Sequence, residues 1–157
     1  MDLTIADRVV FERHPQDNRI LPALFIDATN QESIDRMFWE PIALPMVIPP
    51  MRRILASTIE TVEVPAGVIG LICLRSTWAR LGLMAPPTVA DPGFKGTLTM
   101  EVFNGSCYGI RIEPCMKVWS ISYLKLAVDE PLYRGRYQGQ VGLQLPKALV
   151  SPREGRP

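Results

Sequence analysis

The sequence DPGFKGTLTMEVFN, residues 91–104, indicates the fold more strongly than any other stretch. It opens with Asp91-Pro92-Gly93, which is typical of a β-turn. Strict alternation follows over residues 97–103, with apolar residues on one face and polar residues on the other: Leu98, Met100 and Val102 against Thr97, Thr99 and Glu101. The pattern predicts a half-buried strand that carries a carboxylate on its polar face.

The neighbouring segments predict further short strands. Residues 54–64 are rich in β-branched side chains, 68–74 form a short apolar run typical of a fully buried strand, and 117–126 alternate. Pro65-Ala66-Gly67 and Glu113-Pro114 indicate turns between them. Residues 42–48 are apolar and interrupted by prolines, which indicates an edge strand or extended arm.

Helices are expected to be few and short, because fifteen prolines and eleven glycines are spread along the chain. Residues 31–39 could form one short helix. Residues 76–82 could form another, with Ser76 as its N-cap and Gly82 after its C-terminus. The fold class is therefore mainly β, with one or two short helices.

Length and composition indicate a single domain over 1–157, because 157 residues can bury a sufficient core. We divide it into a variable N-terminal segment (1–39) with weak patterning, a β core (40–128) and a polar C-terminal arm (129–157). A net charge of +1 gives no general attraction to nucleic acid or membrane. The sequence has no signal peptide and no apolar run of about 18 residues. Three widely spaced cysteines, Cys73, Cys107 and Cys115, suit a reducing compartment, so we expect a cytoplasmic protein.

Several chemistries are excluded by the residues that are missing. A zinc-dependent deaminase needs His or Cys ligands, but this chain has a single histidine, His14, and no second cysteine follows Pro114-Cys115 at the required spacing. The sequence predicts no protein metal site, no histidine-based nucleophile, no phosphate-binding Walker loop and no G-x-G-x-x-G motif. Acid/base chemistry would therefore fall to carboxylates.

Four blocks in this order resemble the deoxycytidine triphosphate (dCTP) deaminase family, which shares a superfamily with the dUTPases: ILASTIETVEVP (54–65), RSTWARLGLM (75–84), DPGFKGTLTMEVFN (91–104) and YRGRYQGQ (133–140). The resemblance implies a distorted, jelly-roll-like β-barrel of the dUTPase-like type. It also implies a homotrimer with active sites at subunit interfaces. The implied ligand is dCTP or a related deoxynucleoside triphosphate, bound with Mg²⁺, and the implied reaction converts dCTP to dUTP and ammonia without zinc.

The resemblance also assigns roles to individual residues. Glu101 corresponds to the general acid/base, and a partly buried carboxylate suits that task. Ser76 and Arg80 would hold the water and the base, and two arginines, Arg75 and Arg80, suit phosphate binding. The full nucleotide-binding set is Arg75, Ser76, Thr77, Arg80, Asp91, Thr99, Met100, Glu101, Tyr133, Arg136 and Gln140.

Three departures from the family pattern leave alternatives open. The segment 84–90 is short and lacks the His and Arg common there, Leu74 replaces a small residue, and the N-terminal segment is short, although 20–29 faintly resembles a family motif. A bifunctional enzyme that yields dUMP and pyrophosphate, with Asp91 involved, is one alternative. A monofunctional dUTPase is another, although Glu101 and the tail argue against it. A non-catalytic trimeric protein that binds nucleotide or a partner is the alternative of a different class.

Overall fold

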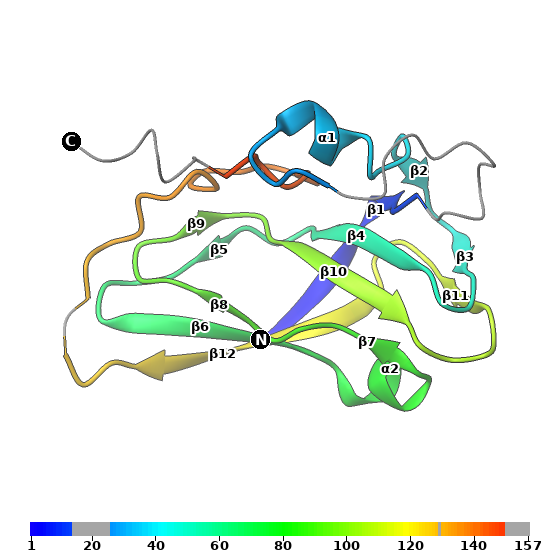
Figure 1. Ribbon diagram of the computed structural model, residues 1–157. Coiled ribbons are helices and arrows are strands. Elements are labelled where there is room, and N and C mark those ends of the chain that lie inside the picture. Colours follow the sequence, from blue (N-terminus) through cyan, green and yellow to red (C-terminus); the bar gives the residue numbers. More distant parts are fainter. Residues whose placement is uncertain (14–25, 129, 150–157) are drawn as a thin grey trace.

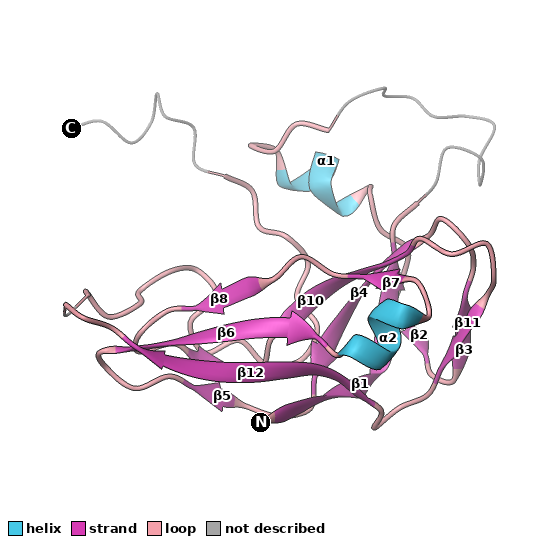
Figure 2. Ribbon diagram, turned by 90° about the horizontal axis from the view of Figure 1, so that it is seen from below, coloured by secondary structure: helices cyan, strands magenta, loops and turns pink. Residues whose placement is uncertain are grey.

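The computed structural model describes residues 1–13, 26–128 and 130–149 (Figure 1). Its main feature is an antiparallel sheet with the strand order β7-β10-β4-β1-β12-β6-β8, and β2 pairs with β1. The strands of this sheet are β1 (Asp2–Phe11), β2 (Ile42–Ala43), β4 (Arg53–Thr58), β6 (Val68–Leu74), β7 (Leu83–Met84), β8 (Thr88–Ala90), β10 (Thr99–Asn104) and β12 (Lys117–Lys125). The sheet curls into a half-barrel, which bears out the predicted mainly β class (Figures 1 and 2).

Two small antiparallel pairs extend the architecture. They are β3 (Met46–Ile48) with β11 (Ile110–Ile112), and β5 (Val62–Glu63) with β9 (Lys95–Gly96). The segment 42–48, expected to be an edge strand or arm, thus supplies two short strands, β2 and β3. The predicted strand 54–64 is interrupted at a turn after Thr58, so it forms β4 and β5 instead of one element.

The N-terminal segment differs from expectation, because its first strand lies in the middle of the sheet. β1 pairs with β12 on one side and β4 on the other. Leu3, Ile5 and Val9 are fully buried. The pairing register shifts between Ile5 and Val9, which breaks the alternation and explains why the sequence pattern looked weak. The β core therefore does not begin at residue 40.

The strand β6 is less buried than its apolar run predicted. Only Gly70 and Ile72 are buried, and the remaining five residues are half-exposed. The prediction of a fully buried strand is wrong because β6 covers the core with one face only. Its partner β12 behaves similarly: Val118, Trp119 and Ile121 are buried, while the residues after Ile121 are exposed.

Two short helices complete the described elements, α1 (Gln31–Asp35) and α2 (Ser76–Arg80). Asn30 caps α1, since its side chain accepts a hydrogen bond from the backbone N–H of Ser33. Ser76 is not the N-cap of α2 as predicted, because Arg75 holds that position without a side-chain cap. Gly82 follows the C-cap residue Leu81 with φ of 98°, as predicted for a helix-ending glycine. No helix in the described part of the chain is long and apolar enough to cross a membrane.

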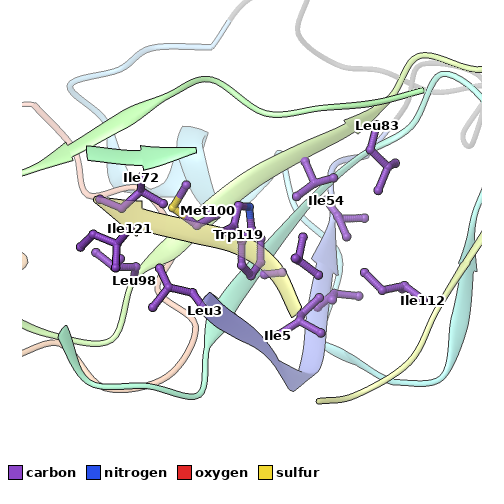
Figure 3. Packing of buried hydrophobic residues seen from close by; sticks show 14 of the residues in the cluster. Leu3, Ile5, Ile54, Ile72, Leu83, Leu98, Met100, Ile112, Trp119 and Ile121 are labelled. Carbon is purple, nitrogen blue, oxygen red and sulfur yellow. The ribbon is translucent and has the colours of Figure 1, made fainter. Parts of the chain in front are cut away.

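The main core fills the inner face of the curled sheet (Figure 3). Trp119, Met100 and Ile121 pack there with Leu3 and Ile72, and each is at most 1% exposed. A second, smaller cluster on the other face of β1 and β4 holds Val10, Ile34, Phe38 and Leu55, with Leu143, Leu145 and Ala148 packed against it. The C-terminal arm therefore contributes apolar contacts, more than its polar composition predicted.

Some predicted features lie outside the described residues. These are His14, residues 20–25 of the segment 20–29, Asp129 at the start of the arm, and the last residues, 151–157.

Candidate functional site

A cavity of about 240 Å³ lies between the start of β10 and the C-terminal arm. It is lined by Leu55, Val89, Ala90, Asp91, Phe94, Leu98, Thr99, Glu101, Tyr133, Tyr137, Gln140, Gln144, Leu145 and Pro146. Five members of the predicted nucleotide-binding set are among these residues: Asp91, Thr99, Glu101, Tyr133 and Gln140. The polar face of β10 and the arm, which are far apart in sequence, thus form one concave site of the kind that binds small ligands.

Glu101 stands in this cavity because β10 is anchored by its opposite face. Met100 and Val102, its neighbours in the strand, are at most 1% exposed in the core. Alternation then directs the half-buried Glu101 side chain to the other face, opposite Leu55 of β4. Among the described residues, no hydrogen bond or ion pair engages its carboxylate, so both oxygens can serve a ligand.

The turn at the mouth of the cavity fixes the beginning of the arm. The N–H of Tyr133 donates to the Pro92 carbonyl at 2.7 Å, and the Tyr133 ring meets Phe94 edge to face with centroids 5.7 Å apart. Gly93 adopts φ of 80° beneath Leu132, and a Cβ there would come within 3.0 Å of the Leu132 side chain. This close approach fixes the position of Tyr133, which lines the cavity together with the exposed Asp91.

Gln140 is joined to the start of β10 by paired hydrogen bonds. The side-chain Nε2 of Gln140 donates to the Thr97 carbonyl at 2.6 Å, and the backbone carbonyl of Gln140 accepts from the Thr97 N–H at 3.0 Å. These contacts fix the orientation of the side-chain amide and leave Oε1 buried without a partner. An unpaired buried acceptor is costly, so the paired hydrogen bonds to Thr97 are made at the expense of this oxygen.

The sequence did not indicate the part of the cavity wall that Gln144, Leu145 and Pro146 supply. The N–H of Gln144 donates to Thr99 Oγ1 at 3.0 Å, which ties this part of the arm to β10. The apolar pair Leu143 and Leu145, which alternates with the polar Gln144, is the signal that could have indicated a buried segment.

The structure does not bring the α2 residues to the cavity, since Arg75, Ser76, Thr77 and Arg80 are absent from its lining. The helix lies beside β7, across the sheet from the arm (Figures 1 and 2). Ser76, Thr77 and Arg80 are exposed there, and no ion pair engages Arg80 within the described residues.

Arg75 belongs to a small charged cluster at the start of β1. It pairs with Asp2, which also lies 3.2 Å from the Lys117 Nζ atom. Hydrogen bonds from Lys117 and then from Arg75 hold the pKa of the Asp2 carboxyl below its ordinary value. The ionised Asp2 carboxylate therefore holds the Arg75 guanidinium beside the sheet.

Two more predicted residues are placed elsewhere. The Met100 side chain is 1% exposed in the main core, on the face of β10 opposite the cavity, so only its backbone could contact a nucleotide. Arg136 donates from Nη1 to the carbonyls of Lys147 and Ala148, which makes it a clasp within the arm.

The described residues also test whether the protein builds a magnesium site. They contain no group of three or more His, Cys, Asp or Glu side chains placed to hold a metal ion. Asp91 and Glu101 are the two carboxylates of the cavity. Mg²⁺ is usually held by one or two carboxylates together with substrate phosphates and water, and the described residues alone do not supply a metal-binding cage.

Comparison with known proteins shows that this chain has a dUTPase-like fold. A solved structure of 2′-deoxycytidine 5′-triphosphate deaminase from Agrobacterium tumefaciens superimposes with a TM-score of 0.59 at 16% sequence identity, covering 78% of this chain and 38% of that one. The likeness establishes the shared fold.

The sequence comparisons identify the family. The family described as dCTP deaminase-like matches residues 1–126. A dCTP deaminase of Ignicoccus hospitalis is 35% identical over 96% of this chain and 82% of its own length. A dCTP deaminase of Pyrobaculum islandicum is 46% identical over 66% of this chain, which spans 58% of that relative's length. The chain belongs to the dCTP deaminase-like family.

Proposed function

We propose that this protein is a dCTP deaminase, which hydrolyses dCTP to dUTP and ammonia. The observation that carries the proposal is the unpaired, half-buried carboxylate of Glu101, in a cavity of about 240 Å³ covered by the arm. Family membership supports the substrate, because the relatives described above carry the name dCTP deaminase.

The reaction needs a group that accepts protons from the attacking water and donates them to the nitrogen atoms of the base. Glu101 would take a proton from water, and the resulting hydroxide would add to C4 of the cytosine ring. The carboxyl group would pass this proton to ring N3, and the carboxylate would then take the proton of the new C4 hydroxyl and give it to the departing amino nitrogen, so that the C4–N bond breaks, the C4 carbonyl forms and ammonia leaves. A carboxylate shielded from bulk solvent can perform both transfers. Atoms balance as dCTP plus water giving dUTP plus ammonia.

A second copy of the chain would complete the site. Ser76 and Arg80 are assigned to the water and the base, Arg75 to the phosphates, and Thr77 to the nucleotide-binding set. All four lie on or beside α2 and away from the cavity of their own chain. We therefore place α2 of a neighbouring copy, in a homotrimer, at the open side of the cavity. Mg²⁺ would arrive with the triphosphate, and it would supply charge neutralisation there.

Two inactive variants should restore activity to each other if sites span copies. Glu101→Gln and Arg80→Ala, each inactive alone, are coexpressed with different tags and purified as mixed oligomers. Each mixed homotrimer should recover about one third of wild-type turnover, because one of its three sites then combines an intact Glu101 with an intact Arg80. Recovery of no activity, with mixed oligomers present, would place both residues in one copy's site or remove Arg80 from it.

The reaction itself is tested by incubating the protein and Mg²⁺ with dCTP, and separately with dUTP, and separating the products by chromatography. Conversion of dCTP to dUTP is the expected result. Because Asp91 lies in the same cavity as Glu101, a bifunctional enzyme is the second candidate, and dUMP with pyrophosphate from dCTP would establish it. Consumption of dUTP alone would identify a dUTPase. No change in either nucleotide would favour a binding protein.

A further inference from the structure

We propose that Gln31, at the start of α1, is a positioning residue that latches the C-terminal arm and thereby holds the cavity wall beside Glu101. The inference deepens the proposed function and rests on it for its consequence in catalysis. The latch itself is a property of the fold, and it can be measured without any substrate.

The Gln31 side chain binds the arm from both ends of its amide group. Nε2 donates to the Pro146 carbonyl at 3.0 Å, and Oε1 accepts from the Ala148 N–H at 2.8 Å. This pairing imitates the two-way hydrogen bonding between neighbouring strands, with one amide side chain in place of a strand. Nε2 also donates to Asp35 Oδ1 at 2.8 Å, four residues on, which fixes the orientation of the amide.

The backbone beside Gln31 continues the attachment. The N–H of Leu149 donates to the Ala28 carbonyl at 2.7 Å. Arg136 and Tyr137 hold the same part of the arm from its other side, because the Tyr137 hydroxyl accepts from the Lys147 N–H at 3.0 Å and Arg136 donates to the Lys147 and Ala148 carbonyls. Residues 146–149 are thus held by hydrogen bonds on two sides, from α1 and the residues before it and from an earlier part of the arm.

Apolar contacts place the gripped segment over the sheet. Leu145 and Ala148 of the arm pack against the second cluster, to which α1 contributes Ile34 and β4 contributes Leu55. Leu55 is the direct cross-strand partner of Glu101. Figure 1 shows the end of the described arm (red) running beside α1 above β4 and β10. Position 31 is therefore connected to the cavity through the arm.

The consequence concerns the ligand-free protein. Gln144, Leu145 and Pro146 line the cavity immediately before the latched residues. A wall that is already in place when the nucleotide arrives need not be ordered at the moment of binding, and such preorganisation raises the apparent affinity. Gln31 would thus act on nucleotide affinity through the arm, at a position remote from the reacting atoms.

The test compares Gln31→Ala with Glu32→Ala in the full chain. Glu32 is the adjacent residue of α1, and its exposed side chain forms an ion pair with Arg36. Amide hydrogen exchange is followed by NMR without nucleotide. In Gln31→Ala, exchange at Ala148 and Leu149 should accelerate about tenfold or more, while the amides of Met100 and Val102 in β10 keep wild-type rates. Glu32→Ala should match the wild type at all four positions.

Kinetic measurements form the second part of the experiment. In Gln31→Ala the KM for dCTP should rise about fivefold to tenfold with kcat within about twofold, because the bound state still forms its wall. Unchanged exchange at Ala148 would overturn the latch, and a fall in kcat at constant KM would overturn its role in affinity. If the wild-type protein proves to have no turnover, the hydrogen-exchange measurement still tests whether Gln31 holds the C-terminal arm. Failure of the proposed function and failure of the latch are therefore distinguishable.

Discussion

Glu101→Gln should lower the kcat for dCTP deamination by about a thousandfold, while dCTP still binds with an affinity within about twofold of wild type. Glutamine has nearly the shape of glutamate and can still accept a hydrogen bond through its Oε1, but it cannot take a proton from water and return it to ammonia. The half-buried side chain has no ion-pair partner among the described residues, so its replacement leaves no neighbouring charge uncompensated. Turnover is measured by ammonia release and binding by calorimetry with dCTP and Mg²⁺.

Glu63→Gln provides the matched control. Glu63 is also a strand carboxylate, but it is exposed on β5, pairs with Lys95 at 3.0 Å and lies outside the cavity. Its replacement should leave kcat and KM within about twofold of wild type, since exposed ion pairs contribute little. A Glu101→Gln protein with kcat within tenfold of wild type would remove Glu101 from proton transfer, and the proposal would then lack its acid/base group.

The parts of the fold that could be predicted from sequence are those with a local, regular signal. β10 combines strict alternation with a preceding Asp-Pro-Gly turn, and both its burial pattern and the orientation of Glu101 agree with the prediction. β1 carries the same kind of signal in Leu3 and Ile5, but the register shift before Val9 moves the following apolar residues out of phase. A sequence pattern of fixed period cannot represent that irregularity.

The parts of the site that could not be predicted depend on contacts between distant residues. Gln31 and Ala148 lie 117 positions apart, and nothing in either short segment indicates the other. The half-exposed face of β6 could not be predicted either, because the apolar run 68–74 does not indicate which face of the strand packs against the rest of the chain. The separation of α2 from the cavity likewise follows from the topology of the sheet. The resemblance of four sequence blocks to a family does not specify that topology.

A buried asparagine at the end of β10 connects the strand to two neighbouring segments. Asn104 is 0% exposed. Its Nδ2 lies within hydrogen-bond distance of the carbonyls of Ile48, Pro49 and Tyr108, at 2.9, 3.2 and 2.8 Å. Its Oδ1 accepts from the backbone N–H and the hydroxyl of Ser106, at 3.0 and 2.8 Å. One side chain thus satisfies the polar groups of β3 and of the turn that leads to β11.

Asn104→Ala should lower the free energy of unfolding by about 3 kcal/mol, because it removes the side-chain donor from the buried Ile48 carbonyl and from two part-buried carbonyls, and the acceptor from the Ser106 N–H. For a chain of this size that corresponds to a fall in Tm of about 6 to 12 °C, measured by thermal unfolding followed by circular dichroism. Asn30→Ala is the matched control, since Asn30 is exposed and accepts one hydrogen bond, from the Ser33 N–H at 3.1 Å, so its loss should cost about 1 kcal/mol. Equal losses in the two variants would show that the Asn104 network contributes no more than a single helix cap. A larger loss at Asn104 would mean that the short β3–β11 pair is held to the main sheet chiefly by this one amide, and the carboxyl end of the strand that carries Glu101 would depend on it as well.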